Sequence, residues 1–145
     1  MGSNQYAYTL NQKLVNKDGI QRFTWDMRHN GAWDKDEKRS YRNGPYVAPG
    51  SYTVRLKVGD RWQEQTFSLE ADPRAAKGGV SLDDMRKQEK LALEIIALQT
   101  EVKQAAENAN PELKAKLVQA EGRYTQPMLI GQIGYLYGIV SRADQ

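Results

Sequence analysis

The chain has 145 residues, of which 39% are apolar and 27% charged, with no cysteine and a formal net charge of +3 from 21 Lys and Arg against 18 Asp and Glu. This length corresponds to one domain or two very small ones, and the lack of cysteine excludes a disulfide framework and a thiolate metal site. Basic and acidic residues are interspersed, which argues against a nucleic-acid surface, and no stretch approaches the roughly 18 apolar residues of a membrane span.

The first half of the chain has the two-residue periodicity of half-buried strands. Apolar and polar residues alternate in Arg22–Arg28 and again in Tyr52–Val58, and more weakly in Tyr6–Leu14. We therefore expect three or four antiparallel strands. A sheet this small needs another surface to cover its apolar face.

A hairpin is predicted after Val58, because Gly59 suits the first central position of a type II′ turn. In that register Arg55 faces Glu64, a complementary charge pair, and Tyr52 faces the ring of Phe67.

The second half has helical periodicity, beginning with a long helix over about Ser81–Glu107. Ser81 and Asp84 have the spacing of a capping box. The residues predicted to be buried on this helix are Leu91, Ile95, Leu98, Val102 and Ala105.

Two shorter helices are predicted to follow. Asn110 and Pro111 have the pattern of a helix start. A third helix has its predicted buried positions at Leu129, Ile133, Leu136 and Val140. The sequence therefore predicts an α+β fold, in which residues 1–73 form a small antiparallel β unit and residues 74–145 an antiparallel helical hairpin or three-helix bundle.

No catalytic, cofactor or metal site is predicted. His29 is the only histidine, and we expect it to lie at a loop edge without a role. The acidic and basic stretch Asp34–Arg39 lacks the later ligands of a calcium loop and is predicted to be solvated. Nucleophile-elbow and phosphate-loop motifs are missing, and no pair of carboxylates stands out for glycoside hydrolysis.

Aromatic residues in or beside loops are the candidates for ligand binding. Trp33, Tyr41, Tyr46 and Trp62 could stack on sugars, since the loop from residue 29 to 49 is long for a strand connection and such loops are often functional. The alternative, which we favour, is that Trp33 and Tyr46 fold back over an open end of the small sheet.

Several motifs together resemble a known family. The run QRFTWDMR at residues 21–28, the run GPYVAPGSYTVRL at 44–56, the DPR motif at 72–74 and the helices that end in YLYGIVSRADQ are similar to the C-terminal region of bacterial exported proteins with sortilin-type β-propellers, glycosidase-like proteins with BNR or Asp-box repeats. The resemblance covers about residues 19–145. The strand pair alone is also similar to the immunoglobulin-like module of flagellar hook-capping proteins, so it implies an immunoglobulin-like β unit.

The resemblance implies that the chain functions as part of a larger exported protein. Our first hypothesis is a noncatalytic accessory domain that ends such an exported protein and packs against its other domains. The alternative is a carbohydrate-binding module using Trp33, Tyr46 and Trp62, and a hydrolase fragment is the third hypothesis. An extracellular or periplasmic location is also implied. Because the residues after Met1 show no signal-peptide pattern, we expect any export signal to lie outside this sequence.

Overall fold

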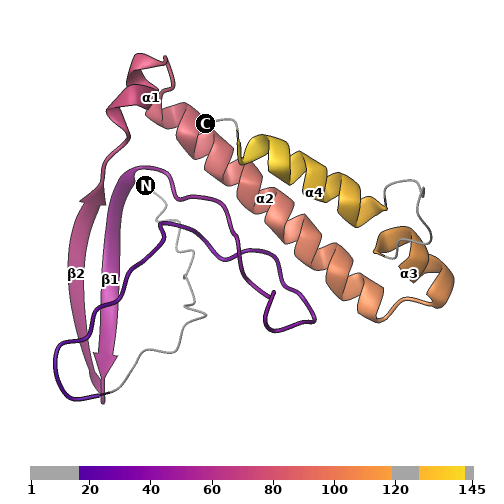
Figure 1. The fold of residues 1–145 in the computed structure, drawn as a ribbon, viewed down its shortest axis with the longest axis horizontal. Coiled ribbons are helices and arrows are strands. Elements are labelled where there is room, and N and C mark those ends of the chain that lie inside the picture. Colours follow the sequence, from indigo (N-terminus) through magenta and orange to yellow (C-terminus); the bar gives the residue numbers. More distant parts are fainter. Residues whose placement is uncertain (1–16, 119–127, 143–145) are drawn as a thin grey trace.

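The computed structural model describes residues 17–118 and 128–142, which form a mixed α+β structure (Figure 1). The elements in chain order are β1 (Gly50–Val58), β2 (Arg61–Leu69), α1 (Pro73–Lys77), α2 (Leu82–Glu107), α3 (Pro111–Leu117) and α4 (Leu129–Val140). Within the described residues, the sheet has two antiparallel strands, β1 and β2. The predicted strand at Tyr6–Leu14 lies outside the described residues.

The β1–β2 hairpin has the predicted register. Tyr52 pairs with Phe67, and Arg55 pairs with Glu64, with 2.8 Å between Arg55 Nε and Glu64 Oε1. Gly59 has a φ of +60°, which a type II′ turn requires at its first central residue and which glycine adopts without a steric penalty. The hairpin and the helices share no backbone contact among the described residues.

The predicted strand at Arg22–Arg28 is wrong. Residues 22–27 belong to no strand, and Arg28 makes only one isolated bridge, with Tyr46. Asp26 Oδ1 accepts a hydrogen bond from the backbone N–H of Arg28 at 3.1 Å, and Met27 between them has a φ of +58°. A short polar side chain that captures a nearby N–H competes with a strand ladder, and the left-handed residue ends the extended backbone.

Trp25 nevertheless lies against the hairpin. Its ring centroid is 5.6 Å from that of Tyr52 and 6.2 Å from that of Phe67. Trp25 therefore packs on the hairpin through its ring, without strand pairing. This cluster covers only the end of the hairpin near Gly50 and Leu69.

The predicted helix starts are confirmed. At α2, Ser81 and Asp84 form the capping box, with Ser81 Oγ accepting from the Asp84 N–H at 3.1 Å. At α3, Asn110 Oδ1 accepts from the N–H of Leu113 at 2.8 Å. None of the helices in the described residues is long and apolar enough to cross a bilayer.

The helical core lies between α2 and α4. Ile95, Val102 and Ile133 are buried together. The partly buried residues around them are Leu117, Val118, Ile130, Tyr137 and Val140.

Part of the predicted apolar stripe faces solvent. Leu91 and Leu98 on α2, and Leu129 and Leu136 on α4, are exposed, while the buried residues of α2 are Ala92, Ile95, Ile96, Val102 and Ala106. The prediction failed because α2 is covered on two adjoining sides, by α4 and by an irregular segment from the first half of the chain, so its buried surface is displaced from the single stripe that we expected.

That irregular segment comprises residues 29–48, and we call it the anchored loop. Figure 1 shows it running from the hairpin out along α2 and back to the start of β1. The favoured interpretation, in which Trp33 and Tyr46 cover an open end of the sheet, is wrong, because the N–H of Trp33 donates to Thr100 Oγ1 of α2 and Tyr46 lines a hollow together with Tyr137 of α4. The loop packs on α2 because a series of polar contacts holds it there.

Candidate ligand-binding cleft

Two glycines allow the limbs of the anchored loop to approach each other. A Cβ on Gly31 would lie 1.8 Å from the carbonyl oxygen of Arg42, and one on Gly44 would lie 2.1 Å from that of His29. The N–H of Gly31 donates to the carbonyl of Tyr41 at 3.0 Å. The loop is therefore a hydrogen-bonded structure that depends on glycine at both positions.

The first and last residues of the loop, His29 and Ala48, are both fixed to α2 by Glu89. His29 Nε2 lies 2.7 Å from Glu89 Oε1, which also accepts from the N–H of Ala48 at 3.0 Å. Burial of Glu89 raises its pKa, but the hydrogen bonds from His29 and Ala48 outweigh burial and hold the pKa below its ordinary value. The expectation that His29 has no role is wrong, because its side chain joins the loop to the helix.

The loop is attached to α2 a second time, at Asp34 and Lys35, by two ion pairs. Lys103 Nζ lies 2.9 Å from Asp34 Oδ2, and Lys35 Nζ lies 2.5 Å from Glu107 Oε2. The hydrogen bond from Lys103 lowers the pKa of Asp34, and that from Lys35 lowers the pKa of Glu107. The acidic stretch that we expected to be solvated thus supplies part of the attachment.

The three aromatic residues of the carbohydrate-binding hypothesis, Trp33, Tyr46 and Trp62, lie on separate parts of the molecule. Trp33 is half-buried, and its backbone N–H donates to Thr100 Oγ1 of α2 at 3.1 Å. Tyr46 is exposed beneath the guanidinium of Arg28, whose Cζ is 3.7 Å from the ring centroid. Trp62 lies on β2 with 59% of its surface exposed. No described ring contact joins any two of them, so they do not form one aromatic platform.

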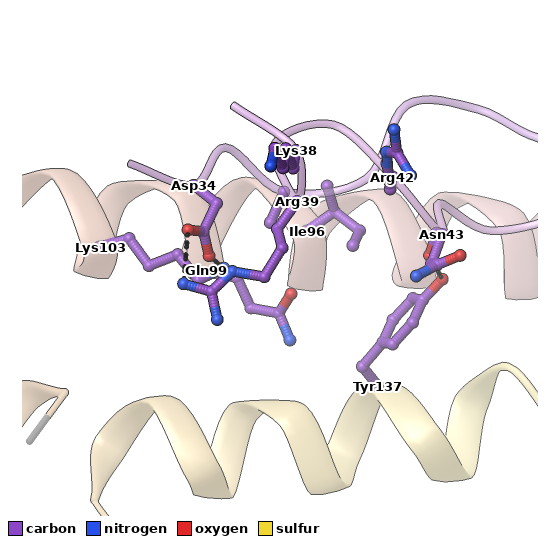
Figure 2. Close-up of a pocket in the computed structure, with 10 residues that line it drawn as sticks. Asp34, Lys38, Arg39, Arg42, Asn43, Ile96, Gln99, Lys103 and Tyr137 are labelled. Carbon is purple, nitrogen blue, oxygen red and sulfur yellow. Dashed lines mark hydrogen bonds and ion pairs between the residues drawn. The ribbon is translucent and has the colours of Figure 1, made fainter. Parts of the chain in front are cut away.

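A cleft of about 490 Å³ lies between the anchored loop, α2 and α4 (Figure 2). Figure 2 shows Arg39 and Lys103 converging on Asp34 at one end, and Tyr137 reaching from α4 to Asn43 at the other. The Tyr137 hydroxyl donates to the carbonyl of Asn43 at 3.0 Å, and burial raises the pKa of Tyr137. Four cationic side chains and one carboxylate line the cleft, namely Lys38, Arg39, Arg42, Lys103 and Asp34.

A second hollow of about 390 Å³ adjoins this cleft. It shares Asn43 and Tyr137 with the first and is also lined by Arg28, Tyr46 and Arg142. Of the four aromatic candidates, Trp33, Tyr41, Tyr46 and Trp62, only Tyr46 lines either of these two hollows. The two hollows together extend along the boundary between the anchored loop and α4.

The arrangement is suited to binding an anion. Within residues 17–118 and 128–142, no three His, Cys, Asp or Glu side chains are grouped to hold a metal ion.

Sequence reasoning missed the cleft because its walls come from the anchored loop, α2 and α4, which are distant along the chain. The only local signal was the basic series Lys38, Arg39 and Arg42.

Comparison of the chain with protein-family models, with curated proteins and with solved structures found no match.

Proposed function

We propose that this chain is a noncatalytic accessory domain at the C-terminal end of a larger exported, extracellular or periplasmic β-propeller protein, and that it docks against the rest of that protein through one face of its hairpin. The observation that supports this proposal is an exposed apolar face of β1, which the described parts of the chain leave largely uncovered. The motif resemblance supports the placement at the end of an exported β-propeller protein, and the exposed face of β1 supports docking through the hairpin.

The uncovered face consists of three aliphatic residues at alternate positions. Val54, Leu56 and Val58 are 54%, 47% and 63% exposed, although alternation places them on the same side of the strand as Tyr52. Trp25 covers only the Tyr52 end. Burial of the exposed half of each aliphatic side chain would contribute about 1 kcal/mol, so contact with another domain would be favourable.

The backbone of the hairpin supports the same interpretation. Among the described residues, β1 and β2 pair only with each other, so each has an outer edge of unpaired N–H and C=O groups. A two-stranded hairpin is at best marginally stable alone. The immunoglobulin-like unit that the resemblance implies would need further strands, and a docking domain could supply them.

The docking proposal is tested by comparing neighbouring residues on opposite faces of β1. Leu56→Thr removes apolar area from the proposed contact, whereas Lys57→Thr changes the other face. Titration calorimetry with the separately produced upstream part of the parent protein should show binding about fivefold weaker for Leu56→Thr and little changed for Lys57→Thr. Failure of the unaltered chain to bind, or equal loss in both variants, would contradict the proposal.

The noncatalytic part of the proposal has its own test. The chain is expected to give no turnover of chromogenic glycosides above a buffer control, and sustained turnover by the pure protein would revive the hydrolase hypothesis.

The second candidate function is a carbohydrate-binding module. Trp33 and Trp62 line neither hollow, but Tyr46 does, which favours a site along the boundary between the anchored loop and α4. Such a module would therefore depend on the cleft more than on a platform of three aromatic rings.

A further inference from the structure

The cleft of Figure 2 has a clear imbalance of charge. Among the described residues that line it, Asp34 is the only carboxylate, and it is engaged by two of the four cations, with Lys103 Nζ at 2.9 Å and Arg39 Nη2 at 3.6 Å. A concave surface that carries one sign of charge concentrates counter-ions of the other sign. The cleft as a whole therefore favours an anionic ligand.

Two of the cations are available to such a ligand. Lys38 and Arg42 form no ion pair or side-chain hydrogen bond with any residue that the structure describes. Both belong to the anchored loop, whose backbone is fixed to α2. The contacts of the loop with α2 therefore position the backbone of both residues, while their side chains are exposed. A carboxylate, sulfate or phosphate group would form charge-assisted hydrogen bonds with them.

The remaining lining groups are suited to hydroxyls. The side-chain amides of Asn43 and Gln99 make no hydrogen bond with any described residue, and each offers both donors and an acceptor. The apolar groups of the described lining are Ala32, Ile96 and the ring of Tyr137. A purely aliphatic acid would leave the two amides unused, whereas a hydroxylated ring would engage them.

The size of the site narrows the ligand class. The cleft of about 490 Å³ lies within the approximate range of 300–1,000 Å³ of small-molecule sites. The adjoining hollow adds Arg28 and Arg142 near the ring of Tyr46, so a ligand of two sugar units could extend from one hollow into the next. A nucleic acid would require a longer basic surface, and the interspersed charges of this chain do not provide one.

We propose that this cleft binds an acidic saccharide, with its carboxylate or sulfate groups held by Lys38 and Arg42 and its hydroxyls by Asn43 and Gln99. The inference deepens the carbohydrate-binding candidate and rests on it. It does not depend on hairpin docking, because the cleft contains no residue of β1 or β2. Either proposal can therefore fail while the other stands.

The test is calorimetric titration of the full chain with three disaccharides, one sulfated and derived from heparin, one of galacturonic acid, and cellobiose as the neutral control. Binding of at least one acidic disaccharide is expected, at least about tenfold tighter than that of cellobiose. The Lys38→Ala/Arg42→Ala double variant should lose at least about tenfold in affinity at an unchanged melting temperature. The matched control is Lys57→Ala/Arg61→Ala, which removes the same charge from the hairpin and should bind as the unaltered chain does.

Four results would overturn the inference. They are no binding of either acidic disaccharide, equal affinity for cellobiose, equal loss in the two double variants, and equal affinity for citrate or a short oligonucleotide. The last result would show attraction of charge without recognition of a sugar. Gln99→Leu provides a second check, since it removes an amide without changing charge and should weaken disaccharide binding while leaving citrate unaffected.

Discussion

The β1–β2 hairpin and the anchored loop both lie outside the helices, yet they are stabilised in opposite ways. The hairpin has regular backbone pairing along its whole length, but much of its apolar face is exposed. The anchored loop has no regular secondary structure, but it is attached to α2 at two places. Hydrogen bonds to Glu89 hold His29 and Ala48, and ion pairs hold Asp34 and Lys35. Regular secondary structure and tertiary attachment are therefore separate properties in this molecule.

This difference bears on function. A strongly attached irregular segment can hold side chains in fixed positions around a cleft. A regular hairpin whose apolar face and outer edges no described residue covers can instead contact another protein. We accordingly place the ligand-binding proposal on the loop and the docking proposal on the hairpin. Predictions that damage one region and spare the other test this division.

The largest effect is expected at the glycines of the anchored loop. Gly44→Ala would place a Cβ 2.1 Å from the carbonyl oxygen of His29, so the limbs of the loop must separate, and we expect unfolding in urea to show a loss of about 3 kcal/mol or more. Gly138→Ala is the control, because nothing lies within 4 Å of its added Cβ and alanine is the better helix former. A stability for Gly44→Ala close to that of the unaltered chain would contradict the close approach.

The next effect is at the junction between the loop and α2. Glu89→Gln removes the negative charge of the carboxylate that contacts His29 and accepts a hydrogen bond from the N–H of Ala48. Urea unfolding should show a free energy of unfolding lower by about 2 kcal/mol. Glu94→Gln on the same helix alters only an exposed pair with Lys90 at 4.0 Å and should cost less than about 0.5 kcal/mol. Equal losses in the two variants would show that the Glu89 contacts do not secure the loop.

Acid should weaken the same attachment. The pKa values of Glu89, Asp34 and Glu107 are lower in the folded chain than their ordinary values of 4.5, 3.8 and 4.5. The unfolded chain then binds protons more readily, so the stabilisation is fully present above about pH 4.5 and is lost as the pH falls through the folded-state values. Urea unfolding at pH 7, 4 and 3 should show decreasing stability. The Glu89→Gln variant should lose less than the parent chain does, and a parent stability that is constant down to pH 3 would contradict this account.

The smallest effect is expected on the exposed part of the hairpin. Leu56→Thr should change the stability of the isolated chain by less than about 0.5 kcal/mol, because its side chain is already half in water. Trp25→Ala should cost more, about 1–2 kcal/mol, since it removes ring contacts with Tyr52 and Phe67. If thermal unfolding showed the greater loss for Leu56→Thr, the face near Leu56 would be covered within this chain.

Local features of the fold could be predicted from the sequence because their causes are local. The hairpin register follows from a glycine turn and alternating side chains, and the start of α2 follows from Ser81 and Asp84. The predicted strand at Arg22–Arg28 failed because the Asp26 side chain captures a backbone N–H, which alternation does not reveal.

The site could not be predicted in the same way. His29 and Glu89 are 60 residues apart, and the Tyr137 hydroxyl reaches Asn43 across 94 residues. Neither contact has a signal in the spacing of residues. The candidates chosen from the sequence were aromatic, whereas the cleft is defined mainly by cations and amides whose neighbours are known only after folding.

Amide hydrogen exchange of the full chain tests the contrast between the two regions most directly. We expect the hydrogen-bonded amides of the anchored loop, such as Gly31, Tyr41 and Val47, to exchange as slowly as those in the middle of α2, and those of β1 and β2 to exchange faster through local opening. Fast exchange in the loop together with slow exchange in the hairpin would contradict the account.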